Sequence, residues 1–216
     1  MKAKNESYIS FLYIIYLYLA WASYIAFIYP GISTGGGLSE LLEEVIRIII
    51  FLLPLYFIRN LTGIPNYKSL GINGNFLQGV KIGAVFSLLY FVVMLPLTLI
   101  AKNQSFTLEL NSNASVWAVL SVAVVVEEVV FRGYLLNYFE RYGKITAIIA
   151  SSLLFVLIHY PGWWLLDMQP SLFGWLQSSF SIFFVGVVLS IIFLRYRSLV
   201  ACRKTQLTLW IFVSFP

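Results

Sequence analysis

The residues best suited to do chemistry are two adjacent glutamates, Glu127 and Glu128, followed by Arg132. They lie about midway along a hydrophobic stretch from Val116 to Phe139. A charged side chain in the middle of such a stretch costs about 2.5–3.5 kcal/mol on membrane-insertion scales. The i,i+4 spacing predicts that Glu128 and Arg132 form an ion pair on one helix face. Glu127 is turned by about 100° from Glu128 and has no partner within the stretch.

This difference in pairing gives the two carboxylates different chemical properties. A carboxylate beside an arginine stays ionised, whereas an unpaired carboxylate in poorly hydrated surroundings takes up a proton more readily. Glu127 would therefore suit a general base that accepts a proton from water. The choice between Glu127 and Glu128 depends on this difference alone. A buried ion pair that orients a helix, or an acid on an ion pathway, would account for the same residues.

The one histidine of the chain, His159, follows the apolar run Phe155–Ile158. At 1.5 Å per residue, His159 lies roughly 20 Å from the inner end of its segment near Ile145. The two glutamates lie roughly 18 Å from the inner end of theirs, near Phe139. Similar depth on consecutive antiparallel helices would bring His159 close to Glu127, where the two could activate water for attack on a peptide carbonyl. A histidine with a purely structural role in the core is the alternative.

The composition indicates a membrane protein. Of 216 residues, 60% are hydrophobic and 11% are charged, against about 25% charged in soluble chains. Apolar runs of membrane-spanning length recur along the chain, so we predict an all-α polytopic transmembrane helical bundle that forms one domain, residues 1–216. These runs exceed the alternating segments of an outer-membrane barrel. The net charge of +5 does not indicate nucleic-acid binding, because the basic residues fall between the hydrophobic runs.

About six spans are predicted, the first ending at Pro30 and the fifth at Pro161-Gly162. The boundaries are residues 8–28, 41–58, 79–100, 116–139, 145–160 and 170–194. With the N-terminus in the cytoplasm, the outer loops receive only Lys102, as the positive-inside rule requires. The basic residues placed on the cytoplasmic side are Lys2, Lys4, Arg59, Lys68, Lys81, Arg141, Lys144, Arg195, Arg197, Arg203 and Lys204.

A second acidic pair begins the predicted second span. Glu43 and Glu44, followed by Arg47, resemble the central motif but are one residue shorter in spacing. Because they lie near the start of their span, we interpret them as a charged turn at the membrane interface.

The central residues also resemble a known family. Glu127-Glu128-x-x-x-Arg132 followed by Phe155-x-x-x-His159 is similar to the first two motifs of the CAAX-protease and bacteriocin-processing (CPBP, or Abi) family of intramembrane endopeptidases. The resemblance implies that Glu127 activates water and that His159 positions or activates the same water. It implies that Glu128 and Arg132 hold the site through their ion pair and contact substrate.

The resemblance covers about residues 71–199, preceded by generic spans in 1–70 and followed by an atypical tail in 200–216. Family members carry a third motif on a last helix, a histidine with an asparagine or similar residue four positions on, which would stabilise an oxyanion. Here residues 200–208 contain no histidine, and we predict an abrupt polar turn in place of that helix. The closing Leu209–Phe215 is too short to cross a bilayer. A frameshifted or truncated gene product would explain this tail.

The family has been described as both metallo- and glutamic-type. Zinc catalysis normally uses three protein ligands and a water, and this chain offers His159 and Cys202 without a convincing third ligand. We therefore expect no cofactor and a glutamate-activated water, with zinc as the alternative that the family description leaves open.

The resemblance implies a multi-pass cell-membrane endopeptidase with a cytoplasmic N-terminus. Its partners would be the lipid bilayer and a peptide or protein substrate that is prenylated or leader-bearing, with no nucleic acid. Two alternatives remain. A catalytically inactive relative could act as a bacteriocin-immunity or binding protein, as the missing third motif suggests. A small proton-linked transporter would use the same intramembrane acids, although the chain shows no internal repeat.

Overall fold

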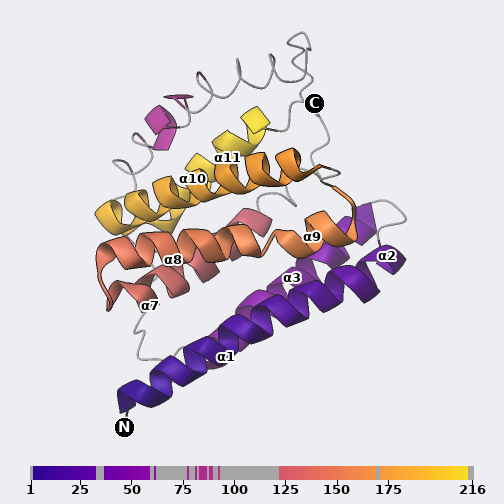
Figure 1. Ribbon diagram of the computed structural model, residues 1–216, viewed down its shortest axis with the longest axis horizontal. Helices are drawn as coiled ribbons and strands as arrows, with labels where there is room; N and C mark the ends of the chain where they lie inside the picture. The colour runs from indigo at the N-terminus through magenta and orange to yellow at the C-terminus, as the bar shows by residue number, and fades with distance from the viewer. Residues whose placement is uncertain are drawn as a thin grey trace.

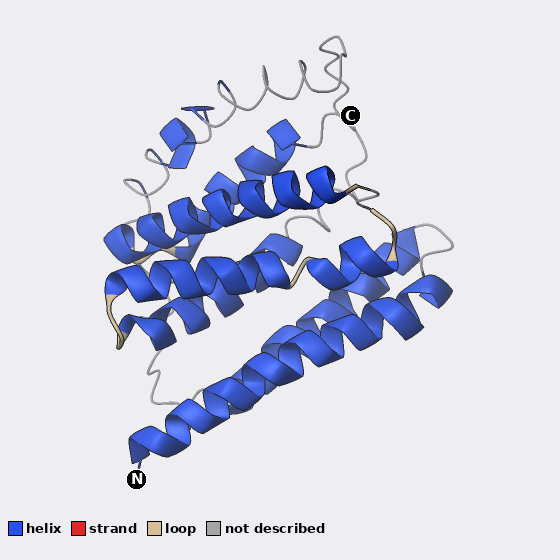
Figure 2. Cartoon of the chain, viewed as in Figure 1, coloured by secondary structure: helices blue, strands red, loops and turns tan. Residues whose placement is uncertain are grey.

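The computed structural model describes residues 2–32, 37–58, 122–168 and 171–213, together with scattered positions between 61 and 92. All regular elements among these residues are helical, which confirms the predicted all-α class (Figure 2). The predicted third span and both polar loops beside it lie largely outside the described residues.

The first predicted span is one long helix that contains a π-helical turn. α1 (Lys2–Ser23) continues into η1 (Tyr24–Ile28) and then into α2 (Tyr29–Ile32). The helix therefore passes Pro30, which we expected to end it. Prolines and π turns are sites where a helix bends without stopping. α3 (Gly37–Ile58) runs back beside α1 (Figure 1).

The fifth predicted span is longer than expected. α8 (Lys144–Leu157) is followed after two residues by α9 (Tyr160–Leu165), so Pro161 lies inside a helix. Proline is tolerated in the first turn of a helix, where its missing N–H would have no partner. Three helices among the described residues are long and apolar enough to cross a membrane: Glu6–Ile32, Lys144–Leu165 and Leu172–Tyr196.

The central motif lies on a helix that changes its winding. Residues 122–128 are helical, η2 (Val129–Leu136) is a π-helix, and α7 (Asn137–Glu140) completes the segment. The sequence predicted a regular α-helix here, so the π-helical winding is a difference. Such π-helical segments often occur at functional sites. The predicted helix stop is present at Gly143, whose φ of 111° suits glycine.

The tail contradicts the sequence-based prediction. α10 (Leu172–Tyr196) packs along α8, and α11 (Leu199–Val213) packs along α10. Residues 200–208 therefore belong to a helix and do not form a polar turn. Ser198 provides the helix start that we overlooked, because its hydroxyl accepts a hydrogen bond from the Ala201 N–H at 3.3 Å, as an N-cap residue does.

The position of α11 is fixed at its start and along its length. Arg197 turns the chain with a φ of 49°, and its guanidinium binds Asn137 Oδ1 at 2.8 Å and Glu140 Oε1 at 2.5 Å. A Cβ atom on Gly83 would lie 1.8 Å from Thr205 Oγ1. Only glycine allows a helix of the predicted third span to approach α11 this closely.

Two buried apolar clusters enclose the motif helix. One joins η2 to α1, α3 and α8, and the other joins its end to α8, α10 and α11. The first comprises Tyr13, Leu17, Phe51, Leu55, Val126, Val130, Phe131, Tyr134, Leu135, Phe155 and Ile158. The second comprises Leu136, Ala147, Val188, Leu189, Ile192, Phe193, Leu199, Ala201 and Cys202.

Candidate functional site

Glu128 and Arg132 form the predicted ion pair in the protein interior. Arg132 Nη1 lies 3.3 Å from Glu128 Oε1, and the exposed fractions of these side chains are 0% and 1%. The guanidinium lies over the Phe155 ring, 4.2 Å from its centroid. Neither charged group has a hydrogen-bond partner among the described residues. Each charge therefore depends on the other for its compensation.

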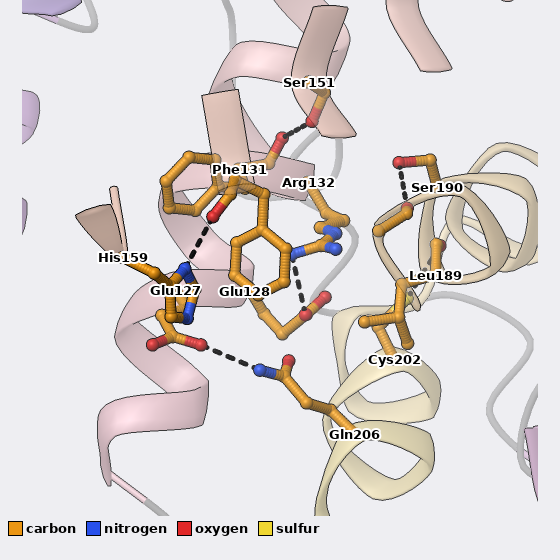
Figure 3. Close-up of polar contacts among 12 residues, drawn as sticks. Glu127, Glu128, Phe131, Arg132, Ser151, His159, Leu189, Ser190, Cys202 and Gln206 are labelled. Atoms are coloured by element: carbon orange, nitrogen blue, oxygen red, sulfur yellow. Dashed lines mark hydrogen bonds and ion pairs between the residues drawn. The ribbon is translucent and has the colours of Figure 1, made fainter. Parts of the chain in front are cut away.

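Glu127 makes its contact with α11. Its Oε2 accepts a hydrogen bond from Gln206 Nε2 at 2.7 Å (Figure 3). Gln206 is buried, whereas Glu127 is partly exposed. Glu127 has no partner within its own segment of the sequence, and Gln206 comes from a helix 79 residues further along the chain. A single glutamine in a polar stretch carries no local signal of such a role.

His159 lies at the joint between α8 and α9. Its Nδ1 is 2.7 Å from the Phe155 carbonyl oxygen. Phe155 lies in the last turn of α8, where carbonyl groups have no N–H partner within the helix. A carbonyl can only accept a hydrogen bond, so Nδ1 carries the hydrogen. In the neutral ring Nε2 is then an acceptor. The ring edge also meets Phe155, with centroids 5.2 Å apart.

The structure brings His159 and Glu127 together from two helices. The imidazole and the carboxylate interact electrostatically, and Figure 3 shows the ring above the carboxylate. The helices are held in register by Ser151, whose hydroxyl donates to the Phe131 carbonyl at 2.9 Å. The Phe131 and Phe155 rings meet with centroids 5.1 Å apart. The matching depth estimated from the sequence thus agrees with the tertiary arrangement.

α3 also reaches the site. Glu44 is 4% exposed, and its Oε1 lies 2.9 Å from Arg47 Nη1. Glu44 interacts electrostatically with Glu127, and Arg47 does so with His159. The Glu44 carboxylate is therefore buried and interacts with Glu127 of the central motif, while its location at the membrane interface stays a prediction.

The donor groups of the site do not fit a metal ion. Within the described part of the chain, no three His, Cys, Asp or Glu side chains converge closely enough to bind one. Cys202 is buried beside Glu128, and its Sγ contacts the Leu189 carbonyl at 3.5 Å. We therefore assign no step of the chemistry to zinc.

Comparison with known families agrees with the geometry. Residues 110–203 match the family described as Type II CAAX prenyl endopeptidase Rce1-like. Over this segment, which is less than half of the chain, the sequence is similar to the CAAX-protease family. The match includes Glu127, Glu128, Arg132 and His159, and it ends before Gln206. No curated protein and no solved structure matches the chain.

The match to this family confirms the resemblance seen in the sequence. It also supports a membrane location, since three described helices have the length and hydropathy of membrane spans. The family match extends four residues past the boundary we predicted at 199, into the start of α11. The beginning of this helix is therefore part of the family-like segment.

Proposed function

We propose that this chain is an intramembrane endopeptidase that hydrolyses a peptide bond with water activated by Glu127. The pairing of Glu127 with His159 carries this proposal. Both groups are partly exposed and interact with each other. Glu128 is less suited to the role of base, because it is buried and its charge is compensated by Arg132.

The two groups can orient one water molecule. The Glu127 carboxylate and His159 Nε2 both accept hydrogen bonds, so a water between them would donate both hydrogens and direct a lone pair outward. Glu127 would take one proton as the water oxygen bonds to the carbonyl carbon, forming a tetrahedral intermediate. The proton would then pass to the amide nitrogen as the C–N bond breaks. The products are a carboxylic acid and an amine, and Glu127 is regenerated.

The ion pair would support this chemistry without taking part in proton transfer. Arg132 and Glu128 link adjacent turns at the start of η2, and Arg132 also lies over Phe155 on α8. This contact fixes the backbone that carries Glu127 against the helix that carries His159. We propose that the pair holds the two reacting groups in place and that the reaction requires no metal ion.

For the substrate, we propose a prenylated peptide presented at the membrane, because the matching family is described as a CAAX prenyl endopeptidase. We also propose a multi-pass arrangement with the N-terminus in the cytoplasm, as the loop charges favour. Protease digestion of sealed cells that carry an N-terminal epitope tag would test the orientation. Removal of the tag from outside would contradict it.

Purified protein in lipid vesicles, supplied with a farnesylated peptide that ends in a CAAX sequence, tests the proposed activity. Glu127→Gln keeps the side-chain shape and removes the base, so we expect kcat to fall by at least about 100-fold. His159→Ala should also lower kcat strongly. Glu43→Gln is the matched control on α3 and should retain activity. A fully active Glu127→Gln enzyme would contradict the assignment.

A second function is favoured by one observation. The chain contains a single histidine, at position 159, and the side chain that α11 contributes beside Glu127 is the amide of Gln206. A protein that binds a peptide without cleaving it would fit a site with one imidazole. In that case the folded wild-type protein would cleave nothing, and its cellular phenotype would survive Glu127→Gln.

A further inference from the structure

The contact between Gln206 and Glu127 has a defined polarity. An ionised carboxylate can only accept hydrogen bonds, so the nitrogen of the Gln206 amide must face Glu127. The distance of 2.7 Å from Nε2 to Oε2 is that of a charge-assisted hydrogen bond. Gln206 Oε1 has no hydrogen-bond partner among the described residues. Within the described part of the chain, Glu127 is the side chain that orients this amide.

Two other side chains on the buried face of α11, Thr205 and Cys202, contact backbone carbonyl groups, and Cys202 also lies beside Glu128. Thr205 Oγ1 donates to the Ala201 carbonyl at 2.9 Å, and Cys202 Sγ contacts the Leu189 carbonyl. Gln206 donates instead to the partly exposed carboxylate of Glu127 on the motif helix, 79 residues earlier in the chain. Gln206 is 2% exposed, and leaving a buried polar group unpaired destabilises the fold. The hydrogen bond to Glu127 therefore offsets part of the free-energy cost of burying the Gln206 amide.

The helix that carries Gln206 is firmly placed. Arg197 binds Asn137 and Glu140 of α7 at the start of α11. Further along, Gly83 lies against Thr205, the residue before Gln206. The amide therefore sits on a fixed backbone and can restrict the carboxylate that it contacts.

A cation on the same helical segment could compete for the Glu127 carboxylate. Arg132 lies five residues further on, inside the π-helix η2 that follows Glu128. If Glu127 turned towards the guanidinium, its charge would be neutralised and it would lose its contact with His159. The hydrogen bond that Gln206 donates from α11 opposes that movement and leaves Oε1 as the oxygen available to water.

We propose that Gln206 is a positioning residue for Glu127: its amide N–H holds Oε2 so that Oε1 accepts the proton of the attacking water. This inference rests on the proposed endopeptidase function and assigns a role to a residue outside the matched family segment. Gln206 does not transfer a proton itself. It acts through the orientation of the carboxylate.

Four variants in the vesicle assay test the role. Gln206→Met keeps the length and removes the donor, so kcat should fall about 10- to 100-fold, the range for a hydrogen bond to a charged group, with KM unchanged. Gln206→Glu places an acceptor against an acceptor and should lose at least as much. Gln206→His restores an N–H donor and should recover part of kcat. Gln177→Met, the same change at an exposed position of α10, should match the wild type.

A thermal-unfolding cycle in detergent tests the contact without any substrate. It compares the wild type with Gln206→Met, Glu127→Met and the double variant. If the side chains interact, the fall in Tm of the double variant should be smaller than the sum of the two single falls. Additive falls would overturn the contact, whatever the enzymatic result.

The two measurements together separate the possible failures. An unchanged kcat in Gln206→Met, with the wild type active, would overturn the positioning role. A raised KM with unchanged kcat would also overturn it, because the residue would then act in substrate binding. If the wild type cleaves nothing while the cycle is non-additive, the proposed function fails and Gln206 is a structural partner of Glu127 only.

Discussion

Two segments of this chain contain an acidic pair followed by an arginine, and the two differ in how deeply the fold buries them. On α3, Glu44 and Arg47 are three residues apart, and the arginine side chain is 20% exposed. At the start of η2, Glu128 and Arg132 are four residues apart, and both are essentially inaccessible. The residue types are the same in both segments. The Glu128–Arg132 pair is the more deeply buried of the two and adjoins a π-helix, and it forms the centre of the candidate site.

Both arginines also lie over an aromatic ring. Arg47 is 5.4 Å from the Trp21 ring centroid, and Arg132 is 4.2 Å from that of Phe155. A cation–π contact strengthens when water is excluded, from about 0.5–1 kcal/mol at exposed sites to about 2 kcal/mol when desolvated. The central pair should therefore be the more costly of the two to disturb.

The largest difference should appear when each arginine is removed. We expect Arg132→Met to lower the free energy of unfolding by about 3–5 kcal/mol, because it leaves the buried Glu128 charge uncompensated. Arg47→Met should cost about 1 kcal/mol, since its partly exposed side chain is screened by solvent. Denaturant unfolding in detergent micelles measures both. Adding Glu128→Gln to Arg132→Met should recover part of the lost unfolding free energy. Equal losses for Arg132→Met and Arg47→Met would contradict the difference between the two segments.

A smaller difference should separate the two rings. Phe155→Leu should cost about 2–3 kcal/mol, from the lost cation–π contact and the space left in the core. Trp21→Leu should cost about 1 kcal/mol, because its arginine is farther away and partly exposed. The same unfolding measurement tests both variants. A Trp21→Leu loss that matches Phe155→Leu would show that α3 and η2 are equally integrated into the core.

The smallest effect should come from the acids of α3. Glu44→Gln removes a charge that acts on Glu127 from a neighbouring helix, so we expect kcat to change less than about fivefold. Glu43→Gln, at the adjacent and more accessible position, should have no effect. The vesicle assay with the farnesylated peptide compares them. A loss with Glu44→Gln as large as that with Glu127→Gln would place α3 within the catalytic set.

Much of the fold could be predicted because each helix carries its own signal. The apolar runs that became α1, α3, α8 and α10 are evident without knowledge of the tertiary structure. The Glu128–Arg132 pair follows from spacing on one helix, and the meeting of His159 with Glu127 followed from counting residues along two consecutive helices.

The sequence-based predictions were wrong where packing against other helices overrides a local helix-stop or turn signal. Pro30 and Pro161 are strong stop signals, yet the helices continue at both positions, after a π turn in one case and in a first helical turn in the other. The polar residues of 200–208 suggested a turn, but burial against α10 and the Ser198 cap produce α11.

The sequence by itself determined the helical class, the membrane-length segments and the four residues of the central motif, because these depend on composition and short-range spacing. Only the tertiary structure decided that Glu44 is buried towards the site and that Gln206 contacts Glu127. Both depend on contacts between helices far apart in the chain. A charge or an amide is costly to bury wherever it lies, and only the packed neighbours determine which partner compensates it.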